Sequence, residues 1–152
     1  MKLLAWLPLL LLVPLTGCEN SGVSYMIEGD NNHSISLLRE QNLPWGEVEQ
    51  QLVPARYPVC QRRVAINTDT KRFTEMKLYQ NDTRLFVANQ GSNWWAVGTE
   101  ACKVQKFDAP PADPGDLVGS FQKKGGKIVF VPVPASAPVT SPVTSPATSP
   151  AK

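Results

Sequence analysis

The sequence is poor in charged residues, and the two signs nearly cancel. Asp, Glu, Lys and Arg make up 18% of the 152 residues, and the formal net charge is +2. Globular proteins usually have about a quarter of their residues charged. The near-neutral balance excludes a strongly basic nucleic-acid-binding protein and an acidic solvating chain.

Catalytic motifs are also absent from the sequence. His33 is the one histidine, and we expect it to be exposed beside a turn at residues 29–32. No nucleophile elbow, phosphate-binding loop or HExxH motif occurs. Two carboxylates can meet in any fold, as glycoside hydrolysis requires, so a small envelope hydrolase stays an alternative. We expect a protein that is not an enzyme.

No apolar run is long enough to cross a membrane as a helix. The run at residues 3–15 has 13 residues, whereas a span needs about 20. It follows Met1 and Lys2, which give a positive start, and it has the length of the apolar region of a secretory signal peptide. We therefore expect a targeting signal here.

The end of that run forms a recognisable pattern. Its residues are Leu15, Thr16, Gly17 and Cys18. An aliphatic residue and two small residues before a cysteine resemble the lipobox of bacterial lipoproteins. The resemblance implies a signal peptide at residues 1–17, cleavage before Cys18, and acylation of Cys18. Two or more acyl chains give stable anchoring; the alternative is an ordinary secreted protein with a cysteine at this position by chance.

The resemblance also implies a location. In enterobacterial lipoproteins an Asp after the cysteine favours retention in the inner membrane, whereas this chain has Glu19. We therefore expect anchoring in the outer membrane, facing the periplasm. Residues 19–22 reach at most about 14 Å before the first expected strand, so the domain is expected to lie close to the membrane surface.

Two cysteines remain besides Cys18. Cys60 and Cys102 belong to an exported chain in an oxidising compartment, which predicts a disulfide between them. The bond closes a loop of roughly 40 residues, worth about 4 kcal/mol in the chain-entropy model. Two separate cysteines and one histidine do not complete a tetrahedral metal site, so we expect no metal and no cofactor.

Short apolar–polar alternations separated by turns predict a mainly β fold. The expected strands are residues 23–28, 33–40, 59–67, 75–79, 84–89, 94–98, 101–107, 117–122 and 127–131. Turn residues at Asn81-Asp82, at 90–92 and at 123–126 link consecutive strands into hairpins. We expect an antiparallel meander that forms a small sandwich or barrel.

Residues 43–55 fit two structures. Trp45, Val48 and Leu52 fit one face of a helix, but Val48 and Leu52 also fit one face of a strand. A glycine and two flanking prolines argue against a long helix. We favour an extended segment, with one short helix over residues 45–53 as the alternative.

Composition divides the chain into three parts. After the leader, residues 18–131 form one lipid-anchored, β-rich domain. Residues 132–152 are rich in Pro, Ser and Thr and contain a degenerate tetrapeptide repeat. Such a segment has too little apolar surface to offset its ordering entropy, so we expect a disordered tail. It is either a spacer directed towards the wall or a dispensable segment.

The domain's charge is uneven along the chain. Residues 19–53 have one base and six acids, net −5, and residues 54–107 have nine bases and four acids, net +5. Arg56, Arg62 and Arg63 gather near Cys60. They predict a basic patch for anionic lipid or a wall polymer, unless the two halves pair their charges across adjacent strands.

Trp94 and Trp95 are adjacent on an expected strand, so their rings face opposite sides. One belongs to the core. The other, Trp94, is either exposed or covered by a loop or by the Trp45 segment. An exposed tryptophan suits a sugar or peptide surface. Trp45, Trp94 and the three arginines are therefore the candidate binding surface; the alternative is that both rings of the pair are packed.

Three short segments resemble those of small uncharacterised proteobacterial lipoproteins. They are residues 36–41, Pro44-Trp45 and residues 60–63. That resemblance carries no activity, so it transfers no functional residue. We expect a membrane-anchored binding or structural module of the envelope. The alternatives are an accessory or inhibitory subunit of an envelope complex, with an envelope protein as partner, and the hydrolase. The oligomeric state is not predicted.

Overall fold

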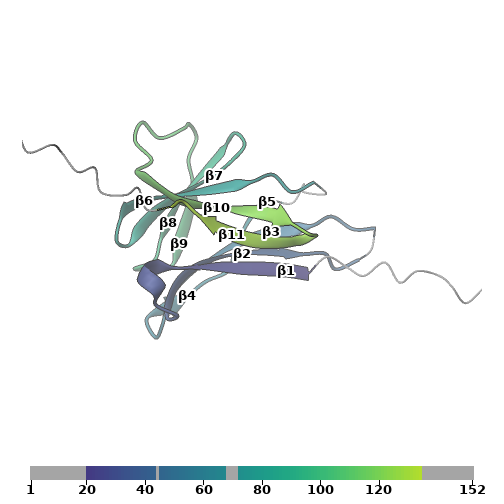
Figure 1. The fold of residues 1–152 in the computed structure, drawn as a ribbon, viewed down its shortest axis with the longest axis horizontal. Coiled ribbons are helices and arrows are strands. Elements are labelled where there is room, and N and C mark those ends of the chain that lie inside the picture. Colours follow the sequence, from purple (N-terminus) through teal and green to yellow (C-terminus); the bar gives the residue numbers. More distant parts are fainter. Residues whose placement is uncertain (1–19, 44, 68–71, 135–152) are drawn as a thin grey trace, which may run out of the picture.

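The computed structural model describes residues 20–43, 45–67 and 72–134. The predicted signal peptide, Cys18 and residues 135–152 of the predicted disordered tail lie outside the described residues. Within them, eleven strands form two antiparallel sheets (Figure 1). The elements are β1 (Asn20–Met26), η2 (Ile27–Gly29, a 3-10 turn), β2 (His33–Glu40), β3 (Glu49–Arg56), β4 (Cys60–Gln61), β5 (Val64–Asn67), β6 (Met76–Asp82), β7 (Leu85–Gln90), β8 (Asn93–Gly98), β9 (Lys103–Lys106), β10 (Asp116–Lys124) and β11 (Lys127–Pro132).

The first sheet has the order β1-β2-β3-β4, and β5 also pairs with β3. Its strands follow from period-2 patterning. In β2, Ile35 and Leu37 are buried, while Ser34 and Ser36, which alternate with them, are half-buried. Leu37 faces Leu52 of β3 across the ladder, so both strands present apolar side chains to the same side.

The second sheet has the order β11-β10-β6-β7-β8-β9. From β6 to β9 it is a meander of consecutive hairpins, as the turn residues predict. The β10–β11 hairpin closes through Gly125 (φ 56°) and Gly126 (φ 81°). Two successive positive φ angles define the turn that matches strand twist, and glycine adopts them without steric cost.

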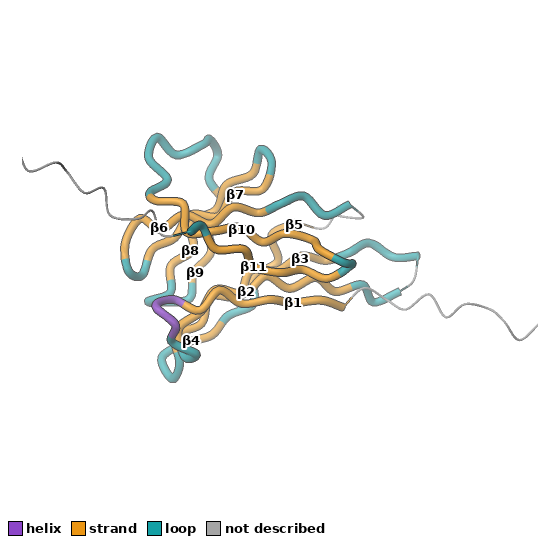
Figure 2. Tube along the Cα trace, viewed as in Figure 1, coloured by secondary structure: helices purple, strands orange, loops and turns teal. Residues whose placement is uncertain are grey.

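The core lies between the two sheets, which form a sandwich (Figure 2). The first sheet contributes Ile35, Leu37 and Leu52, and the second contributes Met76, Leu78, Phe86, Ala88, Trp95, Val97, Phe121 and Ile128. Large aromatic side chains provide much of the area removed from water. Phe121 packs edge-on against Phe130, with ring centroids 5.0 Å apart.

The structure confirms the mainly β, antiparallel fold class and changes three local predictions. Residues 49–56 are strand β3, so the helix alternative for residues 45–53 is wrong. The turn predicted at Asn81-Asp82 is wrong, because a register shift between Gln80 and Asp82 carries β6 through Asp82. The expected strand at 59–67 is divided into β4 and β5.

Antiparallel pairing gives the sandwich two ends (Figure 1). At the N-terminal end, on the right of the view, β1 begins at Asn20, and the β2–β3 loop and the β10–β11 turn lie beside it. At the distal end lie η2, the β3–β4 turn and the β8–β9 turn. After β11, the backbone N–H of Val133 donates a hydrogen bond to the carbonyl oxygen of Val118.

Candidate functional site

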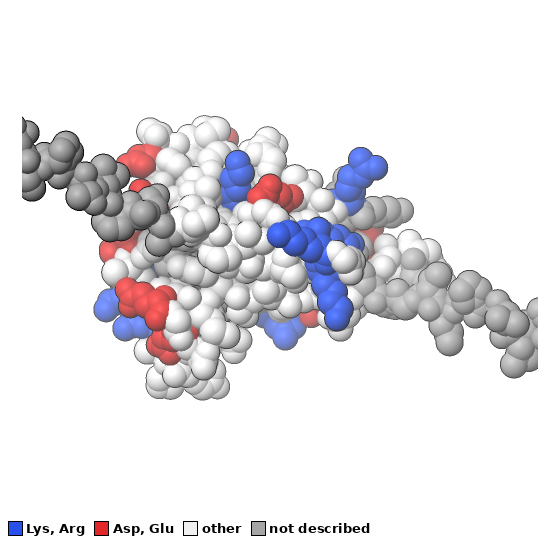
Figure 3. Space-filling view, viewed as in Figure 1, with Lys and Arg blue, Asp and Glu red and all other residues white. Residues whose placement is uncertain are grey.

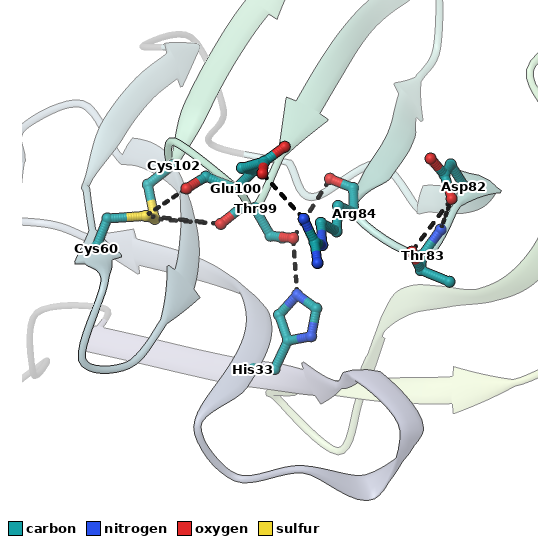
Figure 4. A network of polar contacts seen from close by, with 8 residues as sticks. All are labelled: His33, Cys60, Asp82, Thr83, Arg84, Thr99, Glu100 and Cys102. Atoms are coloured by element: carbon teal, nitrogen blue, oxygen red, sulfur yellow. Dashed lines mark hydrogen bonds and ion pairs between the residues drawn. A yellow bond between two sulfur atoms is a disulfide. The ribbon is translucent and has the colours of Figure 1, made fainter.

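Cys60 and Cys102 form the predicted disulfide, with sulfur atoms 2.02 Å apart and Cα atoms 5.9 Å apart. Cys60 begins β4 in the first sheet, and Cys102 lies in the β8–β9 turn of the second. The bond therefore joins the two sheets at the distal end (Figure 4). The pairing is confirmed.

His33 is not the exposed turn histidine that the sequence predicted. It is the first residue of β2 and is half-buried, because it reaches across to Thr99 in the β8–β9 turn (Figure 4). Its Nε2 lies 2.7 Å from Oγ1 of Thr99. Burial lowers the pKa of His33, and the charge of Arg56 lowers it further. The ring is therefore held towards its neutral form.

The His33–Thr99 pair is built as a structural contact. Thr99 is fully buried, and its hydroxyl donates to the carbonyl oxygen of Arg84 at 3.3 Å. A nucleophile needs a reacting oxygen that substrate can approach, and a base that takes its proton. Here the Thr99 hydroxyl is fully buried, and its hydrogen bond goes to a backbone carbonyl, which is not a base. In the described part of the chain, no cluster of three or more His, Cys, Asp and Glu side chains is arranged to hold a metal.

A groove of about 510 Å³ runs between residues 62–65, which lead into β5, and residues 103–105 of β9. We call it the basic groove. Its lining carries the cations Arg62, Arg63 and Lys103 and no carboxylate. The three cations lie at the edges of the two sheets. Lys103 begins β9, the last strand of the second sheet, and Arg62 and Arg63 precede β5 at the margin of the first. This arrangement attracts anions.

Ion pairs neutralise only part of the positive charge in the basic groove. Arg63 lies 3.3 Å from Glu40, at an exposed position. Such surface pairs contribute at most about 1 kcal/mol. This pair joins the acidic and basic halves of the chain, but Glu40 ends β2 and Arg63 precedes β5, so it does not connect adjacent strands. Arg84 and Glu100 pair within the basic half, 2.9 Å apart, and line a neighbouring depression of about 370 Å³ that also contains a carboxylate from Asp82.

The structure does not bring the five candidate surface residues together. Arg62 and Arg63 line the basic groove, but Arg56 lies at the distal end beside His33. Trp45 lies in the β2–β3 loop at the N-terminal end. Trp94 is half-buried and stacks on Tyr79 of β6, with centroids 6.0 Å apart. Lys103, which completes the groove, was missed because no sequence pattern links it to Arg62.

A buried polar network was also missed. Arg39 and Gln50 are 0% exposed, and Gln90 is 5% exposed. Arg39 Nη1 donates to Gln50 Oε1 at 3.4 Å, Gln50 Nε2 donates to Gln90 Oε1 at 2.7 Å, and Gln90 Nε2 donates to the Thr74 carbonyl at 2.7 Å. The guanidinium also lies 5.2 Å from the ring centre of Phe73. The sequence does carry one signal for the burial of Arg39, which is its position: it continues the inward-facing series of Ile35 and Leu37.

The described residues contain no helix that is long and apolar enough to span a bilayer. In comparisons with known proteins, no family model, curated protein or solved structure matches the chain.

Proposed function

We propose that this protein is a lipid-anchored module of the cell envelope that binds an anionic, extended ligand in the basic groove. The observation that carries this proposal is the convergence of Arg62, Arg63 and Lys103 around one groove with no carboxylate in its lining. The lipobox resemblance at Cys18 supports the anchor. The role is binding rather than catalysis.

The strand edges favour a peptide as the ligand. Among the described strands, β5 pairs only with β3 and β9 only with β8. Each therefore borders the groove with an edge that has no ladder partner. An extended peptide adds to such an edge through main-chain hydrogen bonds, while side-chain contacts give specificity. Acidic side chains complement the three cations, so an acidic segment of an envelope protein fits better than a wall polymer.

Charge reversal in the groove tests this proposal. We expect the Arg62→Glu, Lys103→Glu double variant to bind a fluorescent peptide of alternating Glu and Val about tenfold more weakly than the unaltered protein, because two attractions become repulsions. Fluorescence anisotropy at low ionic strength measures the affinity. Added salt should weaken binding to the unaltered protein, since exposed charges are screened over about 10 Å at 0.1 M.

Lys77→Glu is the matched control, because Lys77 is exposed on β6 away from the groove lining. It should bind the peptide as the unaltered protein does. Equal affinities for the groove and control variants would overturn the groove as the site. A different outcome is that the unaltered protein fails to bind the peptide and sediments with purified peptidoglycan. If only the groove variant then loses that sedimentation, the groove binds a wall polymer.

A further inference from the structure

Two large apolar side chains project from the N-terminal end of the sandwich. Trp45 is 79% exposed and Leu43 is 51% exposed, and both lie in the β2–β3 loop. The backbone N–H of Gly46 donates to the carbonyl of Leu43 at 2.9 Å, which closes a turn around them. Trp45 is the most exposed of the large apolar residues that the structure describes. An indole with an apolar body and a polar N–H suits a membrane–water interface.

The β10–β11 hairpin adds positive charge to the same end. Its tip has Lys124 directly opposite Lys127, and Lys123 precedes them. All three are exposed. Like charges directly opposite each other destabilise a hairpin, so the lysine pair works against the local fold. Figure 3 shows basic side chains gathered over this hairpin tip, on the right.

The chain's anchor belongs to this end as well. β1 begins at Asn20, two residues after Cys18 in the sequence. Two Cα–Cα steps span at most about 7 Å, which is half the reach expected from the sequence. A lipid on Cys18 therefore holds this end of the sandwich against the bilayer.

We propose that the N-terminal end of the sandwich is a membrane-docking surface, with Trp45 and Leu43 in the headgroup region and Lys124 and Lys127 on anionic lipid headgroups. This surface rests on the proposed anchoring through Cys18. The docked domain stands on the bilayer by its N-terminal end, and the basic groove along its side stays open to its ligand. A second protein at this end is the competing occupant.

Lipid quenching of tryptophan fluorescence tests the docking. The lipidated mature protein, purified from membranes, is reconstituted into phosphatidylcholine–phosphatidylglycerol vesicles that contain brominated lipid. We expect strong quenching in the unaltered protein and in the Trp94→Phe variant, which keeps Trp45. The Trp45→Phe variant should lose that quenching. Trp94→Phe is the matched control, because Trp94 lies on the sheet and not in the loop.

The lysines are tested in the same vesicles. A lysine near an anionic bilayer strengthens binding about fivefold, so Lys124→Gln with Lys127→Gln should lower the docked-to-undocked ratio about 25-fold. The variant removes a like-charge pair, so its fold is not weakened. Lys77→Gln should change nothing, and vesicles of phosphatidylcholine alone should remove the difference.

The failures are distinguishable. Protein that floats with the vesicles while Trp45 stays as open to acrylamide as in detergent would overturn the docking and leave the anchor intact. Protein that does not float at all would overturn both. If acrylamide reaches Trp45 in vesicles but not in intact cells, a protein partner covers the N-terminal end. That result would overturn membrane docking.

Discussion

Replacing both Cys60 and Cys102 with serine should lower the free energy of unfolding by about 4 kcal/mol. The bond joins positions 42 apart in sequence, and removing it restores that loop's freedom to the unfolded chain. It is also a covalent link between the two sheets at the distal end, where a short strand, β4, carries one of its cysteines. A domain of this size has a total stability of about 5–15 kcal/mol, so the loss is a large share.

Urea unfolding monitored by tryptophan fluorescence measures this loss. A reductant should shift the unaltered protein by the same amount and leave the double variant unchanged, which separates the bond from the serine side chains. A shift below 1 kcal/mol in the double variant would show that sheet packing alone holds the sandwich closed at the distal end.

The second large effect is expected at Gln50. The Gln50→Leu variant should lose about 3 kcal/mol, because the Arg39 guanidinium and the Gln90 amide oxygen each lose a buried partner. A buried polar group left without its hydrogen bond costs about 1–3 kcal/mol. Leucine has nearly the right size but no polar atom to offer.

Gln51→Leu is the matched control one residue further along β3. Gln51 is half-buried, and its Nε2 donates to Glu49 at 2.9 Å on the other side of the strand. That change should cost less than about 1 kcal/mol. Equal losses for the two variants would mean that strand propensity, and not the buried network, decides stability at this end of the sandwich.

Period-2 patterning predicted the strands where one face is apolar and the other polar. β2 was expected at residues 33–40 and occupies that span, because Ile35 and Leu37 alternate with serines. β6 to β9 were expected as hairpins for the same reason. Period-2 patterning predicted strand boundaries less well where the chain bends between two short strands. Residues 59–67 look like one strand, but they split into β4 and β5, both paired with β3.

The candidate site was only partly predictable, because it depends on contacts between sheets. The density of positive charge near Cys60 predicts Arg62 and Arg63, and both line the groove. Lys103 joins them only because β9 is the last strand of the second sheet and lies near the margin of the first. Arg39 was overlooked because an arginine on an inward-facing position is rare without buried partners, and those partners come from distant strands.

The two proposed surfaces are compatible in one molecule. The docking end carries Trp45 and the hairpin lysines, whereas the groove lies between β5 and β9 along the side. Charge changes in one should leave the other unaffected, because residues far apart without shared partners act independently. This independence allows the variants of each surface to serve as controls for the other.

The intact mass of the mature protein tests the account's central claim most directly. Protein extracted from cell membranes and measured by mass spectrometry should begin at Cys18 and carry acyl chains on it, and Cys18→Ser should abolish that processed form. A chain that begins elsewhere, or that begins at Cys18 with no added lipid, would contradict the anchor and, with it, the docking of the N-terminal end on a membrane.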